Sequence, residues 1–288
     1  MSSLKDFLRL IRFEHTAFAL PYVYIGMLMS PGIGHVGLLL LVKVTLCAVF
    51  ARTSAMVLNR VIDRRIDPLN PRTRDRKGLV EGVGSSKLYV VAIASIVLLV
   101  LVAYTIDPIL AFLAPIAAAI VFVYPYMKRA TSGAHFMLGL ALGIAPVGGF
   151  LSVQMFGYGW SSSMAVIFFT FALLTWVAGF DMIYSFGDIG FDRKKGLHSV
   201  PAKWGKRRAL TLASVLYGTS LTLLYLVTLV SPSPRIGYFV ACVVVGIALA
   251  YQIDLTAKGK WKRAFDLNVW LSPIILAGLL IDFYLPLA

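Results

Sequence analysis

Two pairs of aspartates, each spaced four residues apart, are the residues of this sequence best suited by type and spacing to chemistry. The first pair, Asp63 and Asp67, lies in LNRVIDRRID, and the second, Asp188 and Asp192, lies in DMIYSFGDIGFD. On a continuing helix, residues four apart share one face at about 5–6 Å, so each pair presents two carboxylates side by side. Magnesium binds through one or two carboxylates together with substrate phosphates. We therefore predict that both pairs hold Mg2+ around a diphosphate.

Basic residues accompany both pairs and fit the same chemistry. Arginine forks match the geometry of phosphate oxygens, and lysine adds a point charge. The alternative is that acids and bases only form salt bridges at helix ends, but two pairs of matched spacing favour the metal–diphosphate site. From this set we select Arg60 and Lys194 as substrate-binding residues. The full set is Arg60, Arg64, Arg65, Arg72, Arg74, Arg76, Lys77, Arg193, Lys194, Lys195 and Lys203.

The elements that must position these residues are membrane-spanning helices. The sequence is 59% hydrophobic and only 14% charged, whereas soluble domains have about 45–50% and about 25%. Lipid offers no partner to the backbone of an open sheet, so we expect an all-α bundle around a central cavity. A span needs about twenty mostly apolar residues, and roughly nine fit. They are residues 16–31, 35–58, 87–106, 108–125, 134–151, 162–182, 207–230, 236–253 and 263–285.

The distribution of charge predicts which loops face the cytoplasm. The net charge is +14, and Lys and Arg concentrate in the N-terminus and in the loops after spans 2, 4, 6 and 8. By the positive-inside rule these segments are cytoplasmic, so the basic excess reflects topology and lipid, and we expect no nucleic acid partner. Residues 1–13 predict an interfacial amphipathic helix. The two long loops on this side, 59–86 and 183–206, are the predicted active-site loops of an integral cell-membrane protein.

The two carboxylate pairs recur at a constant offset of 125 residues, from Asp63 to Asp188 and from Asp67 to Asp192. The offset spans four predicted helices, and an even number of spans keeps both pairs on one side of the membrane. This pattern predicts two parallel pseudo-repeats. We expect them to form one transmembrane domain over residues 1–288.

Further polar residues within the predicted spans extend the site. Arg52, Asn59 and Asp63 fall on one helical stripe, which puts Arg52 about 10 Å inside the membrane edge. An intramembrane arginine is costly unless it faces the bundle interior or water, so the stripe predicts a polar cavity below the metal site. Tyr124 and Lys128 lie one turn apart at the end of the fourth span. They are either an interfacial anchor or a further phosphate contact.

The two motifs, the GLHSVP that follows the second, and the predicted spans together resemble the UbiA superfamily of intramembrane prenyltransferases over essentially the whole chain. The resemblance implies that Mg2+ and an isoprenoid diphosphate donor bind at the aspartate-rich segments and that an aromatic acceptor enters the same cavity. The first motif departs from many members in reading Asn59-Arg60 instead of Asn-Asp. Carried over by position, the implied site residues are Asn59, Asp63, Asp67, Tyr124, Lys128, Asp181, Tyr184, Asp188 and Asp192, with Asn59 joining the paired aspartates as a metal ligand.

The second motif also distinguishes branches of that superfamily. DPLNPRTRDR by itself would suit the heme-farnesylating branch, but D-x-x-Y-x-x-x-D-x-x-x-D followed by Gly-x-x-Ser resembles the 4-hydroxybenzoate and dihydroxynaphthoate branch. The resemblance therefore implies prenyl transfer to 4-hydroxybenzoate in quinone biosynthesis, with dihydroxynaphthoate in menaquinone synthesis as the alternative. No obligatory protein partner is evident.

The implied mechanism is an electrophilic substitution. Mg2+ neutralises the diphosphate, and Lys128 stabilises its departing charge. A ring carbon ortho to the phenol attacks the allylic carbocation; we assign Asp188 to activate the phenol and Arg52 to hold the acceptor's carboxylate. A secondary transporter is the alternative from another class, because repeats and a central cavity are also found there. Transporter sites lie near the midplane, however, whereas these carboxylates lie in loops at the cytoplasmic edge.

Overall fold

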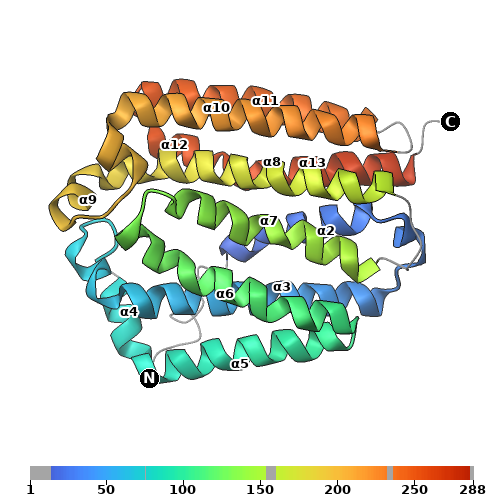
Figure 1. Cartoon of the computed structure of the whole chain (residues 1–288), viewed down its shortest axis with the longest axis horizontal. Helices are drawn as coiled ribbons and strands as arrows, with labels where there is room; N and C mark the ends of the chain where they lie inside the picture. Colours follow the sequence, from blue (N-terminus) through green and yellow to red (C-terminus); the bar gives the residue numbers. More distant parts are fainter. Residues whose placement is uncertain (1–13, 75, 154–159, 232–235, 286–288) are drawn as a thin grey trace.

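The structure, a computed structural model, describes residues 14–74, 76–153, 160–231 and 236–285. Long helices run side by side and form an elongated bundle (Figure 1). As expected, the ordered elements within these ranges are all helical. The predicted amphipathic helix at 1–13 lies outside the described residues. The long helices are α2 (Glu14–Met29), α3 (Leu38–Ile62), α5 (Ser85–Tyr104), α6 (Pro108–Ala130), α7 (Ala134–Val153), α8 (Trp160–Tyr184), α10 (Val200–Val230), α11 (Ile236–Ala257) and α13 (Asn268–Tyr284).

Short helices fill most of the connections between the long ones. The predicted loops 59–86 and 183–206 are therefore largely helical, and α4, α9 and α12 gather at one end of the bundle, at the left in Figure 1. The short helices are η1 (Pro31–His35), η2 (Asp63–Arg65), η3 (Asp67–Leu69), α4 (Arg76–Val83), η4 (Ser185–Asp188), α9 (Ile189–Lys195) and α12 (Trp261–Asp266).

The chain is an integral membrane protein. Among the described residues, 8 helical segments are long and apolar enough to cross a membrane. They expose large apolar side chains, such as Leu38 at 76% and Phe112 at 73% exposure, which a lipid environment tolerates and water does not. The first of the nine predicted spans corresponds to α2, whose apolar part, Ala19–Met29, is shorter than the others.

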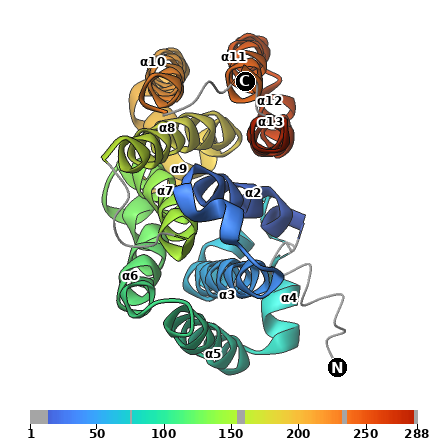
Figure 2. The same cartoon turned by 90° about the vertical axis from the view of Figure 1, so that its right-hand side faces the viewer.

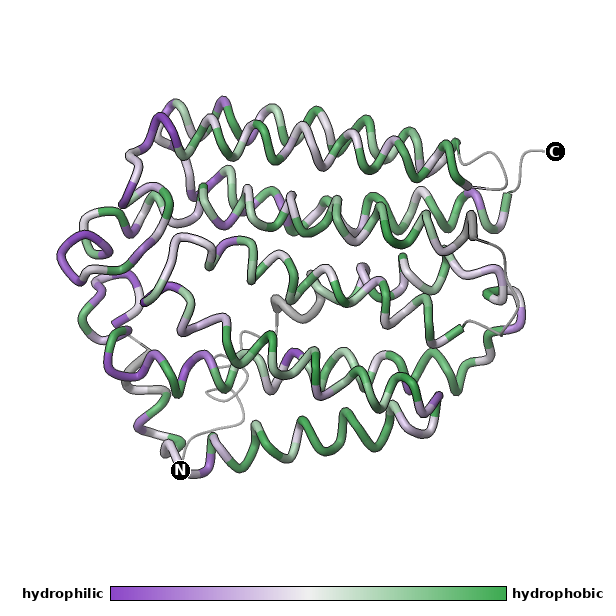
Figure 3. Tube along the Cα trace, in the orientation of Figure 1, coloured by the Kyte–Doolittle hydropathy of each residue, from purple (hydrophilic) through white to green (hydrophobic). Residues whose placement is uncertain are grey.

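Polar residues concentrate at one end of the bundle. In Figure 3, hydrophilic segments gather mainly at the end that carries α4 and α9, while the lengths of the helices are mostly hydrophobic. Both aspartate segments lie at this end, in η2 and η3 and in η4 and α9. The arrangement agrees with the expectation that an even number of spans returns the second segment to the side of the first.

The largest apolar core lies mainly beside the hollow part of the bundle. Trp176 and Phe169 of α8, Leu224 of α10 and Tyr238 of α11 are almost fully buried and belong to one cluster formed mainly by α8, α10, α11 and α13, which Tyr22 of α2 joins and which borders the cavity at Phe180. Figure 2, which looks along the bundle, shows α10, α11 and α13 on one side and α3, α5 and α6 on the other, with α2, α7 and α8 between. Close packing is therefore concentrated in the α8–α10–α11–α13 half.

A buried hydrogen-bonded network fixes the helices of this packed half. The Tyr217 hydroxyl donates to Gln252 Oε1 at 2.6 Å, and Gln252 Nε2 and Trp176 Nε1 both donate to Asn268 Oδ1, at 3.2 and 3.0 Å. Asn268 Nδ2 in turn donates to the Phe265 carbonyl at 2.9 Å. Since polar groups inside membrane helices need partners, this network links α8, α10, α11 and α13 in one arrangement.

Helices α2 and α7 approach each other backbone to backbone. A Cβ atom at Gly149 would lie 2.0 Å from the Val23 carbonyl oxygen, and one at Gly26 would lie 1.9 Å from the Pro146 carbonyl oxygen. Any side chain larger than hydrogen would force the helices apart, which is the usual reason for small residues at membrane-helix contacts. This close contact forms one wall between the packed half and the hollow part.

Gly149→Ala is expected to destabilise the protein, because the new methyl group would overlap the Val23 carbonyl oxygen. Overpacking of this kind costs about 1–3 kcal/mol. The adjacent Gly148 is the matched control: a Cβ there meets no atom within 4 Å, so Gly148→Ala should leave the melting temperature in detergent unchanged or raise it. Equal melting temperatures for the two variants would contradict the close α2–α7 contact.

Candidate active site

A cavity of about 470 Å³ lies among α2, α3, α5, α6, α7 and α8. Residues from the middle turns of the long helices form its apolar walls. Most of its charged residues lie at the helix ends near η2, η3, η4 and α9. A cavity with a charged end and apolar walls suits a ligand with a charged head and an apolar tail. The apolar lining includes Val44, Ala103, Leu113, Ala117, Val121, Leu142 and Phe180.

The first aspartate segment leaves the α-helix where it was expected to continue. α3 ends at Ile62, and Asp63 and Asp67 each begin a short 3-10 helix. The α-helix that we expected to continue through this pair is therefore replaced by 3-10 structure, although the charge of Asp67 still acts on Asp63. Pro68 contributes to the break, because proline disfavours the α conformation in the residue before it, which is Asp67. Both aspartates still line the cavity, and each faces a base: Asp63 Oδ1 lies 3.0 Å from Arg129 Nη2, and Asp67 lies 3.8 Å from Arg60.

The second aspartate segment follows α8 through the 3-10 helix η4. Asp188 ends η4 and precedes α9, and Asp192 lies inside α9, so these residues are close to one helical turn apart. Both are almost completely buried, at 3% and 2% exposure. The hydroxyl of Ser199 donates to Asp192 Oδ2 at 2.5 Å. Burial of two carboxylates is tolerated only with such partners.

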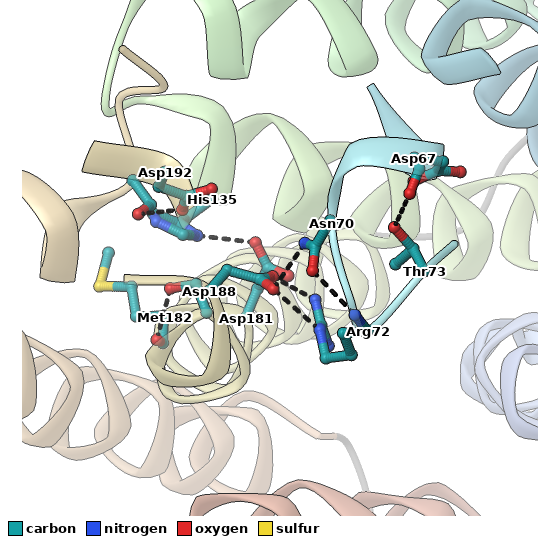
Figure 4. A network of polar contacts seen from close by, with 11 residues as sticks. Asp67, Asn70, Arg72, Thr73, His135, Asp181, Met182, Asp188 and Asp192 are labelled. Carbon is teal, nitrogen blue, oxygen red and sulfur yellow. Dashed lines mark hydrogen bonds and ion pairs between the residues drawn. The ribbon is translucent and has the colours of Figure 1, made fainter. Parts of the chain in front are cut away.

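An ion pair across the cavity joins the two segments (Figure 4). The Nε atom of Arg72 donates to Asp188 Oδ1 at 2.9 Å, Arg72 Nη2 donates to Asp188 Oδ2, and Asn70 Nδ2 adds a third bond to Oδ1 at 2.9 Å. The Arg72 guanidinium also lies 4.2 Å from the centre of the Tyr184 ring. The connection after α3 thus extends over the end of the cavity and binds the connection after α8 through these hydrogen bonds.

Arg72 is also placed to bind a ligand. Burial is the strongest single influence and acts to lower the pKa of Arg72, but the charges of Asp188, Tyr184 and Asp181 and the hydrogen bond to Asp188 together outweigh it, so the pKa is raised and the guanidinium stays charged. Its Nη1 atom is buried and donates to no atom of the described residues. Because Arg72 lines the cavity, Nη1 is a spare donor for an anionic oxygen.

Lys128 lies at the electrostatic centre of the site. The carboxylates whose charges act on it are Asp181, Asp192 and Asp188, and Asp63 interacts with it from the other segment. The Lys128 side chain is half-buried, and an ammonium among carboxylates can meet an anion that approaches through the cavity.

The structure brings together all but one of the predicted site residues. Lys194 is the exception: it is exposed near the end of α9 and does not line the cavity, so we leave it out of the site. The short α9 turns its basic residues away from the cavity while burying Asp192. The predicted residues that line the cavity are Arg52, Asn59, Arg60, Asp63, Asp67, Tyr124, Lys128, Asp181, Tyr184, Asp188 and Asp192.

Several residues of the site were not selected from the sequence. Asn70, Arg129, His135 and Ser199 each donate a hydrogen bond to an aspartate of the site or share one with it. One signal was available for His135, because an ionisable residue inside a predicted span marks a functional site. For Asn70 and Arg129 the sequence carries no such signal, since their contacts span 118 and 66 residues of the chain.

The aspartate carboxylates of the cavity suit a Mg2+ ion that is bound together with a diphosphate. Among the described residues no three His, Cys, Asp or Glu side chains gather around a single point as a closed metal site. Such a closed site is not required, because Mg2+ binds through one or two carboxylates and completes its shell with water and phosphate oxygens. Asp63, Asp67, Asp188 and Asp192 line one cavity and would supply oxygen ligands to such an ion.

Solved structures share this fold. The apo structure of a UbiA homolog from Aeropyrum pernix K1 matches with a TM-score of 0.85 and 28% identity, over 94% of this chain and 98% of the other. The structure of a UbiA homolog from Archaeoglobus fulgidus bound to DMAPP and Mg2+ matches with a TM-score of 0.69 and 22% identity, over 97% and 99%.

Sequence relatives point the same way. A 4-hydroxybenzoate octaprenyltransferase of Saccharophagus degradans is 28% identical over 84% of this chain and 80% of its own length. The protein of the same name from Yersinia pseudotuberculosis is 26% identical over 85% and 84%. The profile of the UbiA prenyltransferase family matches residues 19–272. Because that match spans most of the length of this chain, the chain belongs to the UbiA prenyltransferase family.

Proposed function

We propose that this prenyltransferase catalyses the Mg2+-dependent transfer of a prenyl group from an isoprenyl diphosphate to 4-hydroxybenzoate, in quinone biosynthesis. The observation that carries the proposal is the cavity itself, in which Arg72, Lys128 and the paired aspartates stand at one end of apolar walls. The names of the relatives support the acceptor. The homolog bound to DMAPP and Mg2+ supports the donor and the metal.

The proposed metal ligands are Asp63, Asp67, Asp188 and Asp192, with Asn59. When bound, Mg2+ supplies a template and Lewis acid for the diphosphate. Side chains of the protein carry out the remaining steps. Arg72 Nη1 and the Lys128 ammonium donate hydrogen bonds to diphosphate oxygens. A diphosphate beside Arg72 also competes with Asp188 for the guanidinium, which releases the Asp188 carboxylate for metal binding.

The proposed chemical step breaks the allylic C–O bond of the donor and forms a C–C bond to the acceptor. Arg72 and Lys128 stabilise the negative charge that grows on the leaving diphosphate. Apolar walls exclude the water that would otherwise capture the allylic cation. Arg52 holds the carboxylate of 4-hydroxybenzoate and Asp188 accepts the phenol proton. The ring carbon ortho to the oxygen attacks the allylic carbon, its proton passes to the departed diphosphate, and Asp188 returns its proton to the oxygen, which restores the aromatic phenol.

The proposed orientation places the polar end of the bundle, with both aspartate segments, on the cytoplasmic side of the cell membrane. The distribution of Lys and Arg along the chain supports this orientation. The proposal includes a single domain, and a cavity that receives residues from α2 through α9 and from α12 supports it. Because the chain belongs to a prenyltransferase family, we set aside the secondary transporter that the sequence offered as an alternative function.

An acceptor panel tests the proposed substrate. Membranes containing the protein are incubated with Mg2+, geranyl diphosphate and one acceptor at a time: 4-hydroxybenzoate, a dihydroxynaphthoate or heme. We expect a geranylated 4-hydroxybenzoate, identified by mass spectrometry, and none without Mg2+. A product from dihydroxynaphthoate alone would replace the proposed acceptor by the menaquinone precursor.

Removing one carboxylate from either segment is expected to abolish most of the transfer. Asp63→Asn and Asp188→Asn should each lower the rate by about 10²-fold, because each removes a charged ligand worth several kcal/mol. Asp254→Asn is the matched control: Asp254 is exposed on α11 and pairs with Lys258, outside the cavity lining. Wild-type transfer by either cavity variant would contradict the proposed metal site.

The two lysines that the sequence suggested as phosphate contacts are expected to differ sharply. Lys128→Gln should lower kcat by about 10²-fold, because it removes the ammonium that we propose stabilises the leaving diphosphate. Lys194→Gln should leave kcat and the KM for geranyl diphosphate close to wild type, because Lys194 is exposed outside the cavity. Radiolabelled prenyl transfer measures both variants, and equal losses would place the diphosphate nearer α9 than we propose.

A further inference from the structure

His135, at the start of α7, is a buried polar residue that touches the site without lining the cavity. Its side chain is fully buried. Its Nδ1 atom lies 2.7 Å from Asp181 Oδ2, and its Nε2 atom accepts a hydrogen bond from the Val200 backbone N–H at 3.2 Å. Asp181 itself faces the cavity. His135 can therefore influence the reaction only through its neighbours.

The Val200 contact determines which nitrogen of His135 carries hydrogen. A backbone N–H can only donate, so Nε2 must offer its lone pair, and the hydrogen of the neutral imidazole sits on Nδ1. Nδ1–H then donates to Asp181 Oδ2. One oxygen of this carboxylate is thereby held in place, and the carboxylate keeps a fixed orientation towards the cavity and Lys128, on which its charge acts.

The segment Gly196–Val200 connects this histidine to the rest of the charged site. Gly196 has a φ angle of +66° and ends α9, a left-handed conformation that glycine adopts without strain. The turn brings Ser199 to the carboxylate of Asp192 at 2.5 Å and the His198 N–H to the Lys128 carbonyl at 2.9 Å. Val200, the next residue, then meets His135.

We propose that His135 is a positioning residue for prenyl transfer. It orients the Asp181 carboxylate and, through Val200, ties it to the segment that also holds Asp192 and the Lys128 end of α6. The charges of Asp181, Asp192 and Lys128, at the end of the cavity where we place the diphosphate head, thus keep fixed relative positions. The inference builds on the proposed function, but it concerns a residue that contacts neither substrate nor metal.

Three substitutions separate the two hydrogen bonds of His135. Asparagine can place an amide donor where Nδ1 lies and so keep the Asp181 contact; glutamine can place an acceptor where Nε2 lies and keep only the Val200 contact; leucine keeps neither. We expect His135→Asn to retain most of the transfer rate. His135→Gln and His135→Leu should lower kcat about 10- to 100-fold, as losses of supporting hydrogen bonds commonly do.

A double-mutant cycle tests whether His135 acts through Asp181. In an Asp181→Ala background, His135→Leu should cause little further loss of kcat, because the carboxylate that it orients is already absent. Asn268→Leu is the structural control: it removes a buried hydrogen-bonding residue of the packed half and should lower the melting temperature without lowering kcat of the folded protein.

A second measurement does not depend on turnover. The rise in melting temperature caused by Mg2+ with geranyl diphosphate should be smaller in His135→Gln and His135→Leu than in wild type, and preserved in His135→Asn and Asn268→Leu. If no acceptor is prenylated but these shifts follow the predicted order, the proposed acceptor chemistry fails while the positioning role stands. Equal behaviour of the Asn and Gln variants, or additive losses in the Asp181→Ala background, would overturn the positioning role.

Discussion

The ion pair between Arg72 and Asp188 is the contact on which the charged end of the cavity depends. It joins segments separated by 116 residues, and both partners are largely withdrawn from water, at 26% and 3% side-chain exposure. A charge removed from water needs a partner, so neither segment can take its observed path without the other. Two aspartate segments that would repel each other are held together by an arginine that belongs to the first and binds the second.

The same pairing of charges recurs around the cavity. Asp63 faces Arg129 and Asp67 faces Arg60, whereas Asp192 accepts a hydrogen bond from the neutral hydroxyl of Ser199. The proposed diphosphate, with its metal ions, would bring both signs of charge at once. Cations of the chain would then turn to phosphate while the carboxylates turn to metal, so the total charge at this end of the cavity would change little. The interleaved arginines and aspartates suit such a ligand.

Composition was sufficient to predict the helical membrane fold, because lipid permits few alternatives for a chain this apolar. The paired aspartates could also be recognised from the sequence, because their spacing repeats. The backbone path between Asp63 and Asp67 could not be predicted, because 3-10 structure takes the place of the expected α-helical turn before Pro68. The structure places Lys194 outside the cavity, because proximity in sequence to Asp192 does not imply the same side of a helix of about two turns. Partners such as Asn70 and Arg129 depend on tertiary contacts that no local pattern contains.

The division of the bundle into a packed half and a hollow half has a consequence for how this protein can change. Residues of α6 that line the apolar walls, such as Ala117 and Val121, lie outside the cluster that contains Trp176 and Tyr238, whereas Phe180 belongs to both the walls and the cluster. Substitutions on α6 therefore reshape the space for a prenyl chain while leaving the contacts of that cluster in place. Evolution, or an engineer, can alter which chain is accepted by working on one side of the molecule, and the other side keeps it folded.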